Sequence, residues 1–206
     1  YANHPELQSW VEVPKGSDFP IQNLPFGIFQ PRGLDARVGV AIGNHVIDLV
    51  ALHDLSLLEG LNIPRVALQQ RYLNPLMALG RERTRELRDR LARILEKDSP
   101  YRADKMAEYF LHPMDHVRML LPVQVGDYTD FYSSKEHATN VGSMFRDPDN
   151  ALLPNWLHLP VGYHGRSSSI IVSDSPVYRP MGQTRPDPEQ PPVFGSCKLL
   201  DFEVEM

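Results

Sequence analysis

Cysteine is nearly absent from this sequence of 206 residues, in which Cys197 stands alone. A single cysteine excludes an internal disulfide framework and is typical of a reducing compartment. No stretch approaches the ~20 consecutive apolar residues of a membrane-spanning helix, and the first residues lack the basic and apolar regions of a signal peptide. We therefore expect a cytoplasmic protein that has no membrane as a partner.

Basic charge is also scarce, since 21 Lys and Arg stand against 26 Asp and Glu and give a net charge of −5. A mildly acidic chain is a poor candidate for sequence-independent binding of nucleic acid, which requires a basic surface. Apolar residues at 42% and charged residues at 23% are typical of a soluble globular protein. Proline is in excess, with 19 copies. Because proline breaks helices and central strands, we expect a loop-rich, mainly β fold with some helix, of the α+β class.

The first part of the chain predicts a β-hairpin and then a helix. Residues 38–42 and 45–49 are two β-prone runs separated by Gly-Asn, which predicts a tight turn between them. Residues 74–98 predict a helix that Asn74 caps. Arginines and acids mixed on its outer faces indicate a solvated surface rather than an anion site. Its apolar stripe, at helical spacing, consists of Leu87, Leu91, Ile94 and Leu95.

The character of the chain changes after residue 113. A short helix is expected over residues 104–111, and residues 117–123 predict a strand that enters a new unit. We therefore place a domain boundary near residue 118. Residues 1–118 then form an amino-terminal domain with a helical segment, and residues 119–206 form the first part of a second domain.

Chemically active side chains gather between Asp127 and Arg166. Acids, histidines, aromatics and glycines alternate there without regular periodicity, which is typical of segments that build sites. Taken singly, each residue also has an ordinary interpretation: an aspartate can form a turn, a histidine or arginine can be structural, and a tyrosine can be a core ring with a satisfied hydroxyl. The candidates are Asp130, Tyr132, His137, Arg146 and Tyr163.

The last residues alternate strictly between apolar and acidic side chains. The ordinary interpretation is a half-buried strand with a solvated acidic face. The functional alternative is that Glu203 and Glu205 lie side by side and hold a hard divalent cation, since Ca²⁺ and Mg²⁺ take carboxylate oxygens. Zinc is not indicated, because Cys197 has no histidine nearby.

Taken together, these segments resemble the fumarylacetoacetase family. The resemblance rests on residues 127–142, 155–166 and 201–205, supported by residues 17–25 and the Gly-Val-Ala-Ile-Gly core of the hairpin, and it covers nearly the whole chain. The broader superfamily shares the Glu-x-Glu pair but lacks the amino-terminal domain and the Asp-Tyr-Thr-Asp-Phe-Tyr-Ser-Ser run. The narrower family is therefore favoured.

The resemblance implies an SH3-like β-barrel amino-terminal domain, followed by the start of a mixed β-roll catalytic domain. It implies hydrolysis of a carbon–carbon bond in a β-diketone acid, in which 4-fumarylacetoacetate and water give fumarate and acetoacetate. This reaction is the last step of tyrosine and phenylalanine breakdown. The resemblance further implies a homodimer that uses Ca²⁺ or Mg²⁺.

The same resemblance assigns roles to the candidate residues. Metal ligands would be Asp130, Glu203 and Glu205; the base that activates water would be His137; substrate contacts would be Tyr132, Arg146 and Tyr163. These residue types suit the reaction, because a cation can stabilise an enolate, a histidine can deprotonate water near neutral pH, and an arginine fork matches a carboxylate.

Members of the family continue for roughly as long again, and their second half supplies another metal-binding aspartate, the acid that orients the histidine and several charge-stabilising groups. We therefore expect residues 1–206 alone to be inactive. Two alternatives stay open: an acylpyruvate hydrolase or oxaloacetate decarboxylase on the same scaffold, and a cation-binding module that has lost catalysis.

Overall fold

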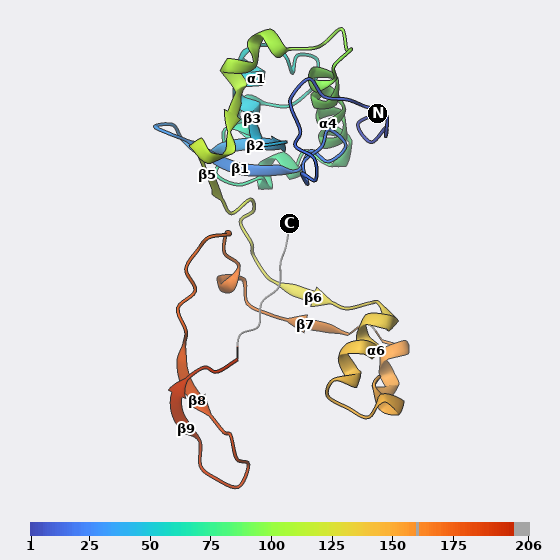
Figure 1. Cartoon of the computed structure of the whole chain (residues 1–206), viewed down its shortest axis with the longest axis vertical. Coiled ribbons are helices and arrows are strands. Elements are labelled where there is room, and N and C mark those ends of the chain that lie inside the picture. The colour runs from blue at the N-terminus through green and yellow to red at the C-terminus, as the bar shows by residue number, and fades with distance from the viewer. Residues whose placement is uncertain (160, 200–206) are drawn as a thin grey trace. The chain divides into compact units, whose positions relative to one another are not determined.

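The structure, a computed structural model, describes residues 1–159 and 161–199. The chain divides into two compact units, Tyr1–Val172 and Ser173–Met206 (Figure 1). No helix in the described ranges is long and apolar enough to cross a membrane. The mixture of strands with shorter helical segments confirms the expected α+β class at this coarse level.

The first unit contains a five-stranded antiparallel sheet with the order β4-β3-β2-β1-β5. Its strands are β1 (Phe26–Pro31), β2 (Arg37–Ile42), β3 (His45–Asp48), β4 (Leu111–Pro113) and β5 (Val117–Leu120). Strands β2 and β3 pair with Ile42 opposite His45, so the Gly-Asn dipeptide forms the predicted hairpin turn. The hairpin is confirmed.

Strand β5 belongs to this sheet, because it pairs with β1 and places Leu120 opposite Ile28. The prediction that residues 117–123 enter a new unit is therefore wrong. The boundary placed near residue 118 falls inside β5, which is held by its partner strand. The division into domains 1–118 and 119–206 otherwise stays a prediction.

Helical segments lie between the hairpin and β5. They are α1 (Leu49–Asp54), α2 (Arg65–Leu68), α3 (Asn74–Met77), α4 (Arg81–Leu95), α5 (Ala107–Phe110) and the 3₁₀ turns η1 (Asp104–Met106) and η2 (Met114–His116). Segments η1 and α5 together confirm the short helix expected over residues 104–111. The helical segments of this region pack with the sheet around a shared apolar core.

The predicted helix over residues 74–98 is divided in two by Gly80. Its φ of +88° lies in the left-handed region that glycine adopts without steric cost, so α3 ends before it and α4 begins after it. The expected cap is also wrong, because Leu73 is the N-cap of α3. The Asn74 side chain instead exchanges hydrogen bonds with the backbone of Gln124, at 2.9 and 3.1 Å.

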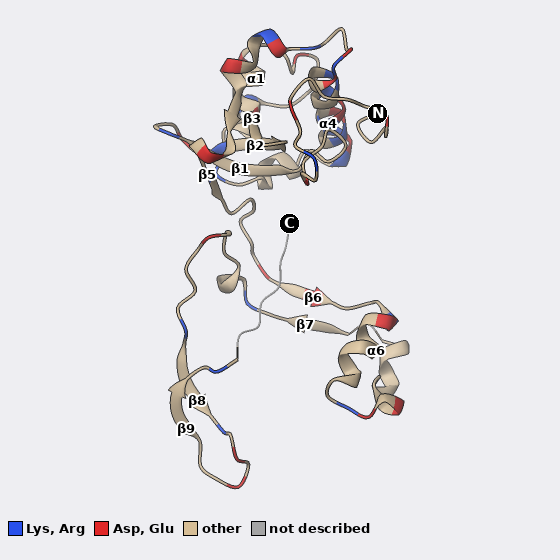
Figure 2. Ribbon diagram, viewed as in Figure 1, with Lys and Arg blue, Asp and Glu red and all other residues tan. Residues whose placement is uncertain are grey.

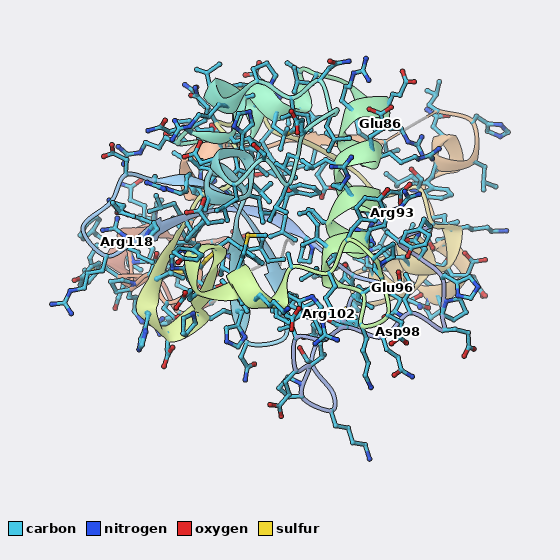
Figure 3. The ribbon with its side chains drawn as sticks, turned by 90° about the horizontal axis from the view of Figure 1, so that it is seen from above. Glu86, Arg93, Glu96, Asp98, Arg102 and Arg118 are labelled. Carbon is cyan, nitrogen blue, oxygen red and sulfur yellow. The ribbon has the colours of Figure 1, made fainter. Side chains whose placement is uncertain are left out.

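The apolar stripe of α4 is confirmed, since each of its four residues is at most 1% exposed. Mixed charges cover the other faces of α4, and Glu86 and Arg93 project outward from it (Figures 2 and 3). Arg83 pairs with Glu86 at 2.9 Å, as expected of a solvated helix face. Arg90 does more, because its Nη1 donates to the backbone oxygens of Leu57 and Glu59 and so ties a loop to the helix.

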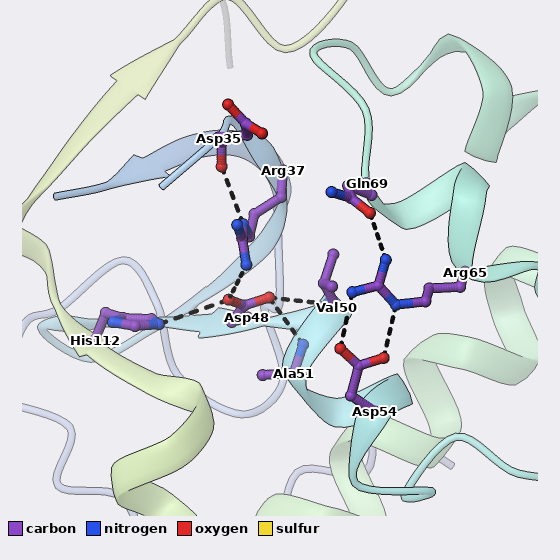
Figure 4. Close-up of polar contacts among 9 residues, drawn as sticks. All are labelled: Asp35, Arg37, Asp48, Val50, Ala51, Asp54, Arg65, Gln69 and His112. Atoms are coloured by element: carbon purple, nitrogen blue, oxygen red, sulfur yellow. Dashed lines mark hydrogen bonds and ion pairs between the residues drawn. The ribbon is translucent and has the colours of Figure 1, made fainter. Parts of the chain in front are cut away.

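A buried carboxylate joins the sheet to α1 (Figure 4). Asp48 is 2% exposed and caps α1, accepting hydrogen bonds from the backbone N–H groups of Val50 and Ala51 at 2.9 and 3.0 Å. Arg37 Nη1 forms an ion pair with Asp48 Oδ2 at 3.3 Å, and His112 Nε2 lies 3.7 Å from the same oxygen. The two backbone hydrogen bonds and the ion pair with Arg37 compensate the burial of the charge, which would otherwise be strongly unfavourable.

The remainder of the described chain forms smaller pieces. In the first unit they are β6 (Thr129–Phe131), α6 (Lys135–Ser143), η3 (Pro148–Asn150), η4 (Pro154–Leu157), β7 (Gly162–His164) and η5 (Ser167–Ser169). Strands β6 and β7 pair antiparallel with each other. In the second unit, β8 (Met181–Thr184) and β9 (Val193–Ser196) form a separate antiparallel hairpin.

Candidate active site

Strands β6 and β7 bring two of the predicted site residues together. Asp130 on β6 lies directly opposite Tyr163 on β7. Directly opposed residues of an antiparallel pair project from the same face, within contact distance of each other. Asp130 is half-buried and Tyr163 is 58% exposed. The predicted metal ligand and a predicted substrate contact are therefore neighbours on one accessible face.

Gly165 makes room for the tyrosine rings at the end of this ribbon. A Cβ atom on Gly165 would lie 2.6 Å from the Tyr128 ring and 2.9 Å from the Tyr163 ring, which is too close for either to stay in place. The Gly165 N–H donates to the Tyr128 carbonyl at 3.1 Å. A residue without a side chain is thus required here for both rings to adopt their observed positions.

Tyr132 follows β6 and contacts Trp156 on η4. Their ring centroids are 6.2 Å apart and the ring planes are tilted by 47°, which is a favourable aromatic arrangement. Tyr132 is 39% exposed, so it is not the core ring of the ordinary interpretation. The structure places Tyr132 one residue beyond the β6–β7 ladder that carries Asp130 and Tyr163.

His137 is held by the first turn of α6. The Ser134 hydroxyl caps this helix and accepts the backbone N–H of His137 at 3.2 Å. The side chain of His137 is exposed. Within the described residues its imidazole has no hydrogen-bond or ion-pair partner, so nothing there fixes which of its nitrogens carries the proton.

Arg146 lies just beyond the carboxyl end of α6. Its Nη1 donates to the carbonyl of Ala151 at 3.1 Å, and its backbone N–H donates to Gly142 at 2.9 Å. Gly142 allows this arrangement, because a Cβ there would collide with the Ala151 carbonyl. A guanidinium has five N–H groups, and within the described chain one of them is used. The remaining fork is suited to an anionic ligand.

The predicted metal site is represented by one residue. Asp130 is an oxygen donor of the kind that Ca²⁺ and Mg²⁺ take, while Glu203 and Glu205 lie outside the described residues. The ranges 1–159 and 161–199 hold no group of three or more His, Cys, Asp or Glu side chains placed to bind a metal ion. The carboxylate of Asp130 suits a hard cation, and a complete metal site would need further oxygen ligands.

Several residues that build this region were not among the predicted site residues. Ser134 as the cap of α6 was detectable, since serine is among the residue types preferred at helix N-caps. The Gly142 and Gly165 contacts were not, because they depend on segments that meet only in the folded chain. The contact between Trp156 and Tyr132 has the same origin.

Comparisons with known proteins place these features in a family. Residues 22–122, which span the five-stranded sheet and its helices, match the family model described as Fumarylacetoacetase N-terminal. The first unit therefore contains an amino-terminal domain of this class.

The whole chain extends the similarity. It is 52% identical over 204 residues to the fumarylacetoacetase of Dictyostelium discoideum, covering 97% of this chain and 48% of that protein. It is 48% identical over 201 residues to the fumarylacetoacetases of Bos taurus and Homo sapiens, covering 96% of this chain and 48% of each. The chain belongs to the fumarylacetoacetase family, and it spans about half the length of the curated relatives it matches.

Proposed function

We propose that these residues form the amino-terminal half of an enzyme that hydrolyses 4-fumarylacetoacetate to fumarate and acetoacetate, the last step of tyrosine and phenylalanine breakdown. The observation that carries the proposal is the identity of 44–52% to fumarylacetoacetases over nearly the whole chain. The segment from β6 to β7 supports it, because it holds Asp130 beside Tyr163 and presents an arginine fork.

In the proposed mechanism His137 takes a proton from water at an imidazole nitrogen, and the resulting hydroxide attacks the carbonyl carbon of the fumaryl group. The bond between this carbon and the neighbouring CH₂ then breaks, and its electron pair leaves with the acetoacetate fragment as an enolate, which a proton quenches. A bound Ca²⁺ or Mg²⁺ ion would supply Lewis-acid stabilisation of the diketone oxygens, with Asp130, Glu203 and Glu205 as ligands.

The other predicted site residues bind and orient the substrate. Arg146 pairs its free N–H groups with a terminal carboxylate of the substrate. The hydroxyls of Tyr132 and Tyr163 fix its orientation by hydrogen bonds from otherwise apolar rings. Because Tyr163 faces the same side of the ribbon as Asp130, it reaches substrate that is held beside that carboxylate.

Finer points of fold and assembly belong to the same proposal. The five-stranded sheet is interpreted as an SH3-like barrel, and the segments from β6 onward as the start of a mixed β-roll. The complete enzyme is proposed to be a cytoplasmic homodimer. The relatives are about twice as long as this chain, and His137 lacks an orienting partner within the described residues. Residues 1–206 alone are therefore proposed to be inactive.

The test uses the full-length protein that contains these residues. We expect the diketone absorbance of fumarylacetoacetate to fall as the protein cleaves it. A chelator should abolish this reaction, and added Ca²⁺ or Mg²⁺ should restore it. His137→Gln should lower kcat by at least ~10²-fold, which is the usual contribution of a general base. Faster turnover of an acylpyruvate or of oxaloacetate would contradict the substrate. Unchanged activity of His137→Gln would contradict the mechanism.

A further inference from the structure

Trp156 differs from every other buried polar side chain of the described residues in having a hydrogen that no acceptor receives. Three buried side-chain nitrogens lack a hydrogen-bond partner there: His45 Nδ1, His112 Nε2 and Trp156 Nε1. Either histidine nitrogen can be the unprotonated nitrogen of a neutral ring, and then no N–H is stranded. An indole nitrogen is a donor only, so Trp156 has no such alternative.

The other tryptophan of the chain shows the usual arrangement. Trp10 donates its Nε1–H to the carbonyl of Ile94 at 2.8 Å, and its ring packs edge-on against Phe110 at a centroid distance of 6.5 Å. Trp10 is thus fixed by a hydrogen bond as well as by packing. Among the described residues the Trp156 ring packs against Tyr132, and its buried N–H has no protein acceptor.

The backbone that carries Trp156 is well anchored. Its N–H donates to the Leu153 carbonyl at 3.0 Å, and the Asn155 carbonyl accepts from the backbone N–H groups of His158 and Leu159, also at 3.0 Å. The indole ring therefore projects from a hydrogen-bonded 3₁₀ turn. Its aromatic neighbour is Tyr132, whose ring is tilted by 47° to the indole.

We propose that Trp156 is a positioning residue for Tyr132: contact with the tilted indole ring holds the tyrosine ring so that its hydroxyl is presented to the substrate. This inference rests on the proposed function, which makes Tyr132 a substrate contact. It explains why a tryptophan is tolerated at a position that leaves its N–H unsatisfied. A buried group left unsatisfied in a native structure calls for an explanation, and a functional role is one such explanation.

The proposal separates the ring of Trp156 from its N–H group. Trp156→Phe keeps an aromatic face against Tyr132 and removes the stranded N–H. Trp156→Leu removes the aromatic face and leaves a branched side chain. We expect Trp156→Leu to raise KM for fumarylacetoacetate by about three- to tenfold, the value of one aromatic pair, with a smaller change in kcat. We expect Trp156→Phe to stay within about threefold of the wild-type KM.

A double-mutant cycle tests whether Trp156 acts through Tyr132. Tyr132→Phe removes the hydroxyl that the indole is proposed to present, so Trp156→Leu should have little further effect on KM in that background. Trp10→Phe is the matched control, because it removes the hydrogen bond to Ile94 outside the site. It should lower the Tm and leave KM near the wild-type value.

The experiment measures kcat, KM and Tm for these variants in the full-length enzyme. If Trp156→Leu leaves KM unchanged, or if its effect adds fully to that of Tyr132→Phe, the inference is wrong. If Trp156→Phe raises KM as much as Trp156→Leu, the N–H itself is used and positioning by packing is overturned. Should Trp156→Leu fail to fold, Trp156→Met takes its place. A wild-type enzyme that does not cleave fumarylacetoacetate would refute the proposed function instead, before Trp156 is tested.

Discussion

The residues up to 125 and those from 127 onward differ in how many of their apolar side chains are buried. Among the described residues, the buried hydrophobic side chains all lie in the first region except Ala138 and Ala151. The second region instead exposes large side chains, including Phe145 at 79% and Tyr178 at 84%. The first region therefore stabilises itself with an apolar core, whereas the second region keeps its shape by local contacts.

Those local contacts are specific even though they bury little surface. The cap on α6, the close approach of Gly142 to Ala151 and the pairing of Asp130 with Tyr163 each fix a short piece of backbone. The comparison teaches that local hydrogen bonds and close backbone contacts can arrange the candidate residues without a large apolar core around them.

The largest expected effect tests the core of the first region. Leu91 is fully buried on α4, so Leu91→Ala should lower the free energy of unfolding by about 3 kcal/mol through lost burial and the cavity left behind. Leu157→Ala, at a position that is 60% exposed in the second region, is the matched control and should change it by less than about 0.5 kcal/mol. Urea unfolding followed by circular dichroism measures both. Equal effects would refute the comparison.

The next effect concerns the buried carboxylate. Asp48→Asn keeps a side chain of the same shape but leaves Arg37 without its counter-charge and weakens the cap of α1. We expect a loss of about 2 kcal/mol in the free energy of unfolding. The double variant with Arg37→Met should recover part of this loss, because the uncompensated charge is then gone. No recovery in the same urea assay would mean that the ion pair is unimportant.

A smaller and local effect is expected in the second region. Gly142→Ala forces a methyl group against the Ala151 carbonyl and should displace α6 from the chain that Arg146 holds. Overpacking of this kind costs about 1–2 kcal/mol, and amide hydrogen exchange should rise in α6 but not in the five-stranded sheet. Gly182→Ala, where the added methyl group meets nothing within 4 Å, is the control. Protection of α6 that matches the wild type would contradict the close contact.

The smallest effect is a pH dependence from the Arg65–Asp54 ion pair. The hydrogen bond from the Arg65 guanidinium lowers the pKa of the Asp54 carboxyl in the folded chain. Stability from this pair is therefore present above the ordinary pKa of an aspartate and is lost as the pH falls through the lowered value. Because both side chains are nearly half exposed, the Tm of wild type should exceed that of Arg65→Met by less than about 2 °C at pH 6. A difference that does not shrink as the pH falls below the ordinary pKa of an aspartate would contradict this origin.

What could be predicted from the sequence follows the same division. The hairpin and the stripe of α4 were predictable, because turn chemistry and apolar periodicity act over a few residues. The break at Gly80 was not predicted, because the helical pattern of the sequence continues on both sides of this glycine. The partner of β5 was missed because β1 lies about ninety positions earlier in the chain, and no local pattern encodes such a pairing.

The candidate site was predictable as a set of residues and not as an arrangement. Residue type and the family resemblance selected Asp130 and Tyr163, but their opposition across two strands depends on where the chain returns after α6. The contact of Trp156 with Tyr132 depends on the same return. The roles of Glu203 and Glu205, which lie outside the described residues, stay predictions.

The order of strands in the five-stranded sheet has a geometric consequence. Strands β4 and β5 occupy opposite edges, yet only the three residues of η2 connect them. In a flat sheet those edges would be about 19 Å apart, at four interstrand spacings, whereas four Cα–Cα steps reach at most about 15 Å. A flat sheet is excluded, so the sheet must curve until its outer strands approach each other. The short η2 connection thus keeps the two edge strands close together. An insertion there, which most surface loops would tolerate, would let the edges separate and expose unpaired backbone to other chains.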